Sequence, residues 1–281
     1  NQSGKRLSKG HRKIAEYIVE HYDKAVFMTA SKLGEKVGVS ESTVVRFATE
    51  IGYSGYPALQ QAMQEMIRNR MTSVQRLEMT STNIPLDRLL DSSMDQDIDI
   101  IRRTKESISH EEFYRAADAL VKVKKVYIIG AGSSLAIATF LSHYFSLVFD
   151  SVQLISATSE AQILQQMVHI GEGDALIGIS FPRYSKRTLS AMKYARDRGA
   201  RVIALTDSQL SPLARVADHV LLARSDMASF VDSLVAPLSV INALIVAVGM
   251  SRRDEIEQTF NKLERIWEEY DVYEKPEDDI N

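Results

Sequence analysis

The chain has 281 residues, of which 45% are hydrophobic and 25% charged, with a formal net charge of −3, as in a soluble globular protein long enough for two domains. It contains no cysteine, which excludes disulfides, thiolate metal sites and cysteine nucleophiles, and fits a reducing compartment. Because no segment approaches the roughly 20 apolar residues of a membrane span and the polar N-terminus is unlike a signal peptide, we expect a cytoplasmic protein without membrane contact.

The net charge hides an asymmetry between the two ends of the chain. Residues 1–80 contain 12 Lys and Arg against 8 Asp and Glu, a net of +4, whereas residues 81–281 contain 22 against 29, a net of −7. A basic N-terminal region before an acidic remainder indicates that only the first region meets a polyanion such as DNA.

An amphipathic N-terminal helix is followed by two shorter predicted helices. Thr29 or Ser31 caps the first of these, and Gly38 ends it in the left-handed conformation of a tight turn. Ser40 then caps the second helix, residues 41–51. Helix, glycine turn and capped helix form the helix-turn-helix pattern, whose second helix enters the DNA major groove by its N-terminal end.

The second helix of this pattern has an apolar face and a polar face. Val44, Phe47 and Ile51 are predicted to turn toward the core. On the outer face, Ser42 and Arg46 are the best candidates for base contacts, because arginine is the commonest partner of guanine. Neighbouring polar residues suit phosphate contacts, so that the predicted DNA-contacting set is Lys36, Ser40, Ser42, Thr43, Arg46, Ser54 and Tyr56. The alternative is a three-helix module for protein binding or dimerisation.

The segment VSESTVVRFATEIGYSGYPALQQAM resembles the N-terminal domain of RpiR-type bacterial transcriptional regulators, over about residues 1–77. The phrase STVVRF followed by GYSGY is more specific than a general helix-turn-helix pattern. The residues that carry the resemblance are Ser40, Thr43, Val44, Arg46, Phe47, Gly52, Gly55 and Tyr56. It implies a ligand-responsive transcription factor that binds its operator DNA as a dimer.

A change of composition separates this region from the rest of the chain. A helix is predicted from Ala58 to Met79, and the polar stretch 80–86, which contains Pro85, is predicted to be the hinge between the domains. Charge-rich residues 87–108 and the shorter stretch 110–121 are predicted as helices that lead into the first strand.

From Lys125 onward, apolar runs alternate with helical stretches. The predicted strands are 125–130, 152–156, 174–180, 200–206 and 218–223, and the predicted helices between them are 135–148, 159–169, 186–198 and 211–216. This order predicts an α/β fold with a doubly wound, five-stranded parallel sheet that binds ligands outside the carboxyl ends of its strands. An apolar helix at 229–248 and an amphipathic tail at 252–270 follow, and the tail is expected to pack within an oligomer.

The first strand leads into VYIIGAGSS, residues 126–134. Gly130 and Gly132 allow a sharp turn, after which Ser133 or Ser134 caps a helix. The free N–H groups of a helix N-terminus form a natural anion site. Since Leu135 replaces the third glycine of a dinucleotide fingerprint, this motif by itself fits a structural turn as well as a ligand site.

The third strand ends in ISFPRYSKRT, residues 179–188. Together with GAGSS, this ordering resembles the sugar isomerase (SIS) domain over about residues 108–250, a flavodoxin-like fold in which GxGxS and SxSGxT motifs line a phosphosugar pocket. Pro182 and Arg183 replace the second serine and the glycine of the latter motif, and Arg183 offers a charged, bidentate partner in place of a hydroxyl. The resemblance implies ligand contacts from Gly132, Ser133, Ser134, Ser180, Arg183 and Ser185.

Catalysis would require a general base beside the substrate. Glu160 and His169 are the candidates, and each has a structural interpretation, as a first-turn helix carboxylate and as a surface or helix-end group. The six histidines show no metal-ligand spacing, so neither a metal nor a cofactor is predicted.

The sequence therefore predicts a transcriptional regulator, homodimeric or homotetrameric, that binds operator DNA and a small anionic effector such as a sugar phosphate. The predicted domains are a DNA-binding head at 1–79, a hinge and connecting helix at 80–107, a sensing SIS domain at 108–250 and a tail at 251–281. Two alternatives are a sugar-phosphate isomerase with a basic helical appendage and a purely structural oligomerisation body on a DNA-binding head.

Overall fold

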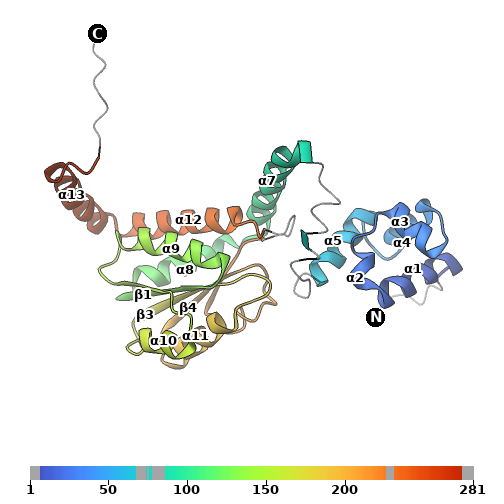
Figure 1. Ribbon diagram of the computed structural model, residues 1–281. Coiled ribbons are helices and arrows are strands. Elements are labelled where there is room, and N and C mark those ends of the chain that lie inside the picture. Colours follow the sequence, from blue (N-terminus) through green and yellow to red (C-terminus); the bar gives the residue numbers. More distant parts are fainter. Residues whose placement is uncertain (1–6, 68–73, 75, 78–85, 226–230, 274–281) are drawn as a thin grey trace, which may run out of the picture. The chain divides into compact units, whose positions relative to one another are not determined.

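The computed structural model describes residues 7–67, 74, 76–77, 86–225 and 231–273 (Figure 1). The chain divides into two compact units, residues 1–83 and 84–281. The predicted hinge at 80–86 and the end of the predicted helix 58–79 lie almost entirely outside the described residues.

The described residues of the N-terminal unit form helices joined by turns and short connections. Its helices are α1 (Lys9–Glu20), α2 (Tyr22–Ala25), α3 (Ala30–Val37), α4 (Glu41–Glu50) and α5 (Tyr56–Ile67). Ile14, Leu33 and Val44 are fully buried where α1, α3 and α4 pack together. The prediction that Ile51 faces the core is wrong, because α4 ends at Glu50 and Ile51, at the C-cap, is 42% exposed.

Tyr56 ties α5 to the segment between α2 and α3. Its ring is buried, and its hydroxyl donates a hydrogen bond of 2.7 Å to the carbonyl oxygen of Met28. The amide of Gln60 donates to the same carbonyl at 3.0 Å. Burial raises the pKa of Tyr56 to about 12, since the phenolate form loses its hydration inside the unit.

The C-terminal unit begins with a short 3-10 helix, η1 (Leu86–Arg88), and continues as an α/β domain. Its elements are α7 (Leu89–Ser107), α8 (His110–Val121), β1 (Lys125–Gly130), α9 (Ser133–Phe145), β2 (Val152–Ile155), α10 (Glu160–Gln166), β3 (Asp174–Ile179), α11 (Lys186–Asp197), β4 (Arg201–Thr206), β5 (His219–Leu222), α12 (Val235–Ser251) and α13 (Arg253–Glu269). All five predicted strands are therefore present.

One predicted helix of this unit, 211–216, is wrong, since the segment forms consecutive turns. Pro212 has no N–H to contribute to a helix, and the hydroxyl oxygen of Ser211 accepts a hydrogen bond from the backbone N–H of Ala214 at 3.1 Å. Leu213 and Val216 are nevertheless buried against the sheet.

The sheet is parallel throughout, with the strand order β2-β1-β3-β4-β5. On one face α8, α9 and α12 pack against Val126 and Ile128 of β1, whereas α10 and α11 cover the other face, where Tyr127 and Ile129 are buried. Because helices cover both faces, the four successive residues 126–129 of β1 are all apolar or aromatic.

The chain leaves β1 and β3, which are neighbours, in opposite directions. From β1 it passes through α9 to β2 at one edge of the sheet, and from β3 through α11 toward β4 and β5. The two helices lie on opposite faces, so the carboxyl ends of β1 and β3 flank the topological switch point where ligands bind in such folds.

The described helices include an apolar one, α12. By length and composition, none of the described helices could cross a membrane by itself, and α12 satisfies that test only together with α13, from which it is bent by 98°.

We predict that Tyr56→Phe lowers the free energy of unfolding by about 1 kcal/mol near neutral pH, because the hydrogen bond to Met28 is lost. The ordinary pKa of tyrosine is 10.0 and that of Tyr56 is about 12, so the unfolded chain loses its proton first as the pH rises. The stabilising contribution of Tyr56 is therefore complete below pH 10 and declines above it.

Urea denaturation followed by circular dichroism at several pH values between 7 and 12 measures this difference. The difference in the free energy of unfolding between the wild type and Tyr56→Phe should become smaller above pH 10, because 10.0 is the ordinary pKa of tyrosine. Tyr22→Phe, at an exposed tyrosine of the same unit, serves as the control that leaves stability unchanged. Coincident curves for the wild type and Tyr56→Phe at every pH would contradict the assignment.

Candidate functional site

The helix-turn-helix pattern forms as predicted in α3 and α4. The hydroxyl oxygen of Thr29 caps α3 by accepting from the N–H of Lys32 at 3.2 Å. Gly38 takes a left-handed conformation with φ of 72°, and Ser40 caps α4 by accepting from the N–H of Thr43 at 3.3 Å. These local interactions fix the turn that aims the N-terminal end of α4 outward.

The exposed face of α4 presents the candidate base-reading side chains. Ser42 and Arg46 are both exposed, and the Nε of Arg46 donates to the carbonyl oxygen of Ser42 at 3.3 Å. The hydroxyl of Ser40 lies 2.9 Å from that of Ser42 and 2.8 Å from that of Thr43. The first turn of α4 thus carries three hydroxyls and helix N–H groups, a combination suited to phosphate oxygens.

Two of the three remaining predicted DNA contacts, Lys36 and Ser54, are exposed. The prediction that the third residue, Tyr56, contacts DNA is wrong. Its side chain is only 3% exposed, and its hydroxyl donates a hydrogen bond to the carbonyl oxygen of Met28. Tyr56 therefore supports the fold of the unit and does not reach a phosphate.

In the C-terminal unit, the loop from β1 to α9 is shaped by two glycines. A Cβ on Gly130 would lie 2.5 Å from the carbonyl oxygen of Ser134, so only glycine lets the first turn of α9 pack directly against the end of β1. Gly132 has φ of 59° and ψ of −132°, a conformation essentially restricted to glycine.

The predicted serine cap of α9 is wrong, because Gly132 occupies the N-cap position. Among the described residues, no side chain caps α9, so its first backbone N–H groups are directed outward from the end of β1. Ser133 is exposed and Ser134 is buried in this first turn. An open helix N-terminus at a sheet edge is suited to an anion.

The loop from β3 to α11 is held by its own serines. The hydroxyl oxygen of Ser180, which is buried, accepts from the N–H of Ser185 at 3.0 Å. The hydroxyl oxygen of Ser185 in turn caps α11 by accepting from the N–H of Thr188 at 3.2 Å. In both contacts the serine is the acceptor, so that each hydroxyl keeps its own proton for donation to an oxygen of a ligand.

Arg183 has a left-handed backbone with φ of 65° and an exposed side chain. It stands at the position where the resembling motif has glycine, and the glycine-type conformation is kept although the residue has a Cβ. Such a conformation costs about 1–2 kcal/mol for a residue other than glycine. The loop therefore maintains a strained backbone at the residue that carries the guanidinium.

The structure adds residues that the sequence analysis missed. Thr188 is fully buried, and its hydroxyl oxygen has no hydrogen-bond partner within the described part of the chain. Asp207, directly after β4, accepts from the hydroxyl of Tyr184 at 2.9 Å and from that of Thr206 at 3.3 Å. A polar pair at the end of an apolar strand, as in Thr206 and Asp207, is a sequence signal by which this edge could have been found.

The two loops start side by side. Gly130 is paired with Ile179 in the parallel register of β1 and β3, so the six predicted ligand residues all follow these two adjacent strand ends. Tyr184, next to Arg183, connects the same edge to β4 through Asp207.

The two candidate bases are separated by the fold. Glu160 begins α10 and is exposed, with Ser159 as the N-cap, which agrees with a first-turn carboxylate. His169 is exposed, follows α10 and precedes β3 at the amino edge of the sheet, which agrees with its structural interpretation as a surface or helix-end group. Among the described residues, no group of three or more His, Asp or Glu is arranged to hold a metal ion.

Two family models match the chain. Residues 1–70 match the helix-turn-helix domain of the rpiR family, and residues 119–247 match the SIS domain. The HTH-type transcriptional regulator HexR of Escherichia coli (strain K12) is 28% identical over 271 residues, which cover 94% of this chain and 91% of HexR.

Solved structures share the fold. The sugar isomerase domain of an RpiR transcription factor from Sphaerobacter thermophilus has a TM-score of 0.60 and 27% identity, and the match covers 63% of this chain and 99% of that domain. The NanR protein of Vibrio vulnificus, solved in complex with ManNAc-6P, has a TM-score of 0.58 and 20% identity, with 93% of each chain covered.

We predict that Arg183→Gly raises the free energy of unfolding of the C-terminal unit by about 0.5–1 kcal/mol, because glycine adopts the left-handed conformation without a steric penalty. Lys193→Gly, at an exposed position in the middle of α11, is the contrasting control and should cost about 1 kcal/mol. Chemical denaturation measures both changes. If the two variants are equally destabilised, contacts of the Arg183 side chain outweigh its backbone strain.

Proposed function

The chain belongs to the RpiR-type transcriptional regulators, in which a helix-turn-helix domain precedes a SIS domain, and we propose that it senses a phosphorylated sugar and couples this to operator binding. The observation that carries the proposal is the pair of loops at the switch point. The open N-terminus of α9 and the hydroxyl-rich loop after β3 follow strands that are neighbours in the sheet.

In this proposal, the effector's phosphate binds at the N-terminus of α9 and the serines of both loops donate to its oxygens. The charge of Arg183 adds a bidentate contact of the kind that arginine forms with phosphate. The proposed ligand contacts are Gly132, Ser133, Ser134, Ser180, Arg183 and Ser185. The V. vulnificus NanR complex with ManNAc-6P supports a sugar phosphate or a related anionic metabolite as the ligand class.

The DNA-binding proposal rests on the exposed face of α4. Arg46 and Ser42 read bases, while residues around the first turn of α4 and the following loop contact phosphates. The proposed contacts are Lys36, Ser40, Ser42, Thr43, Arg46 and Ser54, without Tyr56. Two copies of the head bind the two half-sites of an operator, so the protein acts as a homodimer or homotetramer, in the cytoplasm where operator DNA is found.

We propose a sensor without catalysis. The head comprises residues 1–79, the connecting segment 80–107, the sensing domain 108–250 and the tail 251–281. Glu160 follows β2 at the carboxyl edge of the sheet, whereas His169 lies at the other edge. An effector changes operator affinity only by binding two conformations with different affinities.

We predict that Arg46→Ala weakens specific operator binding by about 1–3 kcal/mol and relaxes the base preference at one position of the site. Lys36→Ala provides the contrast, because losing a phosphate contact weakens binding to all sequences alike and lowers the salt dependence. Binding isotherms on operator and randomised DNA at several salt concentrations separate the two effects. If affinity and footprint stay unchanged in Arg46→Ala, that residue does not read the operator.

We predict that sugar phosphates raise the melting temperature of the wild type in a thermal-shift screen. Arg183→Gly should bind the active compound about 10–100-fold more weakly, because a charge-assisted contact worth about 1.5–3 kcal/mol is lost. Arg183→Lys keeps the charge without the bidentate geometry and should lie between the two. Undiminished stabilisation of Arg183→Gly would place the ligand elsewhere.

The same compounds distinguish a sensor from an isomerase. Incubation with the stabilising sugar phosphate, followed by chromatography of the sugar, should show unchanged ligand. Product that accumulates in proportion to protein concentration and time would favour the enzyme. If no metabolite stabilises the protein, the SIS domain serves only in oligomerisation.

A further inference from the structure

Helix α12 has an unusual composition for a helix at the surface of a unit. Its 17 residues, VAPLSVINALIVAVGMS, include no charged side chain, and apolar residues occur all round its circumference. One side is buried against the sheet through Val240, Ile241 and Leu244. On the other side Val246 is 61% and Met250 64% exposed. A helix that is apolar all round is normally buried on all sides, which indicates that this outer side has a partner.

Two further helices extend the exposed apolar surface. In Figure 1, α7 and α13 stand at opposite ends of α12 and on the same side of it. On α7, apolar residues that are exposed recur every three or four positions: Leu90, Met94, Ile98 and Ile101. None of the described residues of α13 is buried, although Phe260 and Ile266 lie on its apolar stripe.

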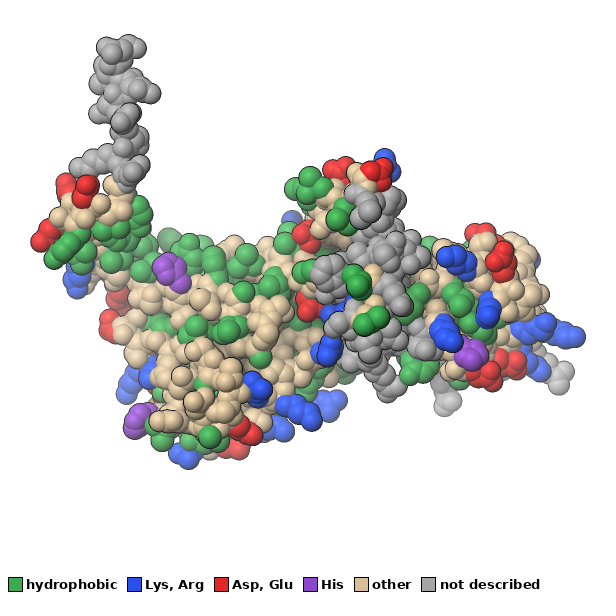
Figure 2. Space-filling view, in the orientation of Figure 1, with side chains coloured by type: hydrophobic (Ala, Val, Ile, Leu, Met, Phe, Trp, Pro, Cys, Tyr) green, Lys and Arg blue, Asp and Glu red, His purple; other side chains and the backbone are tan. Residues whose placement is uncertain are grey.

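The apolar sides of these helices face the space above α12. Figure 2 shows hydrophobic side chains along α12 and on the mutually facing sides of α7 and α13, with acidic side chains on the outer side of α13. We call this the α7–α12–α13 surface, formed by the exposed sides of Leu89–Ser107, Val235–Ser251 and Arg253–Glu269.

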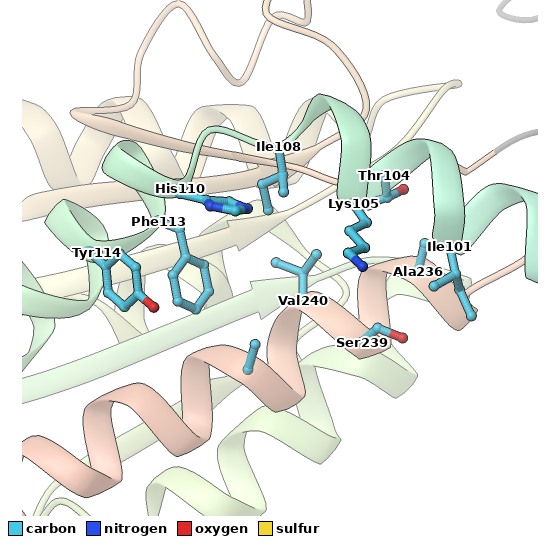
Figure 3. A pocket seen from close by; sticks show the side chains of 11 residues that line it. Ile101, Thr104, Lys105, Ile108, His110, Phe113, Tyr114, Ala236, Ser239 and Val240 are labelled. Carbon is cyan, nitrogen blue, oxygen red and sulfur yellow. The ribbon is translucent and has the colours of Figure 1, made fainter.

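A groove lies at one end of this surface, between α7, α8 and α12. It has a volume of 380 Å³ and is lined mainly by apolar side chains, among them Ile101, Phe113 and Val240 (Figure 3). Its residues on α12, from Ala236 to Ala243, belong to the N-terminal half of that helix. None of the six proposed ligand contacts lines it.

We propose that the α7–α12–α13 surface binds a second copy of this chain, with the two α12 helices packed antiparallel about a two-fold axis. The proposal rests on the homo-oligomer of the proposed function and names its contact surface. In this arrangement α13 of one copy occupies the groove between α7, α8 and α12 of the other.

Direction is the first argument for a second copy. A two-fold axis through the outer face of α12 reverses the helix, so the C-terminal end of one α12 lies beside the N-terminal half of its partner. Helix α13 leaves that C-terminal end at 98°, and the groove lies at that N-terminal half. The same two-fold axis therefore places α13 of each copy beside the groove of the other copy. The two contacts lie at opposite ends of α12, which is about 25 Å long.

Charge is the second argument. An isologous contact places each surface against itself, so a patch with charge of one sign would repel its copy. The outer side of α12 carries only uncharged residues such as Ser239, Asn242 and Ala243, and is therefore compatible with itself. Helix α13, with six acidic and three basic residues, would meet a groove whose polar side chains include Lys105 and His110.

The test measures the oligomeric state of the full chain by sedimentation and light scattering. Ala243→Glu places two carboxylates close to the axis and is expected to raise the dimer dissociation constant at least about 100-fold. Because Ala243 is exposed, the variant should fold, which its circular dichroism and melting temperature verify. Val168→Glu, at an exposed valine after α10 on the other side of the sheet, should dimerise like the wild type.

The outcomes separate this inference from the proposed function. A dimer of wild-type affinity in Ala243→Glu would overturn the α12 contact while leaving the homo-oligomer intact. A monomeric wild type would overturn both the contact and the oligomer, whereas ligand and operator binding are measured independently. Loss of dimerisation in both glutamate variants would also count against a contact specific to α12.

Crosslinking tests the direction of the contact without a stability assumption. Since the chain has no cysteine, single cysteines can be introduced at Ile101 and Phe260 and the two variants mixed. A short bis-maleimide should link Ile101→Cys of one copy to Phe260→Cys of the other, and a size tag on one variant identifies the mixed product. Phe260→Cys mixed with Val168→Cys is the control. Equal yields from the two mixtures would overturn the antiparallel arrangement.

Discussion

The approach of α9 to the end of β1 is the contact on which the candidate ligand site depends. A Cβ on Gly130 would lie 2.5 Å from the carbonyl oxygen of Ser134, so any larger residue would push α9 away from the sheet. The close approach places the first N–H groups of α9 at the carboxyl end of β1, beside the loop that follows β3. The proposed binding of an anion at this site thus depends on packing between a strand and a helix.

The loop after β3 is stabilised differently from the loop between β1 and α9. Its serines form successive hydrogen bonds, from the N–H of Ser185 to Ser180 and from the N–H of Thr188 to Ser185, and these hold the turn in place. Within that turn Arg183 keeps a left-handed backbone in spite of its Cβ. A residue maintained in a strained conformation is consistent with a functional role for its side chain, here the provision of positive charge.

Apolar residues serve two purposes in this chain. Those of β1, β3 and β4 are buried by helices on both faces, and they determine the fold. Those on the outer sides of α7, α12 and α13 are not needed for the fold of one copy, because they are exposed in it. In the proposed oligomer, such a surface would join two copies whose heads read the two half-sites of one operator.

Features that depend on neighbouring residues could be predicted from the sequence. The strands, the glycine turn at Gly38 and the caps at Thr29 and Ser40 result from local propensity and from hydrogen bonds within a few residues. That the β1 and β3 loops lie at one edge of the sheet was predictable as well, because parallel strands present their carboxyl ends together. That these two strands are neighbours is a result of the tertiary structure.

Tertiary structure alone decided which of these side chains are free to act. The phenol of Tyr56 is of a type that can contact a phosphate. However, packing against the segment between α2 and α3 buries the ring, and the hydroxyl donates to the carbonyl oxygen of Met28. His169 follows α10, and the direction of that helix places it at the amino edge of the sheet, opposite the candidate site. Burial and position in space depend on residues far apart in the chain, whereas the pattern of a sequence records mainly what each segment does by itself.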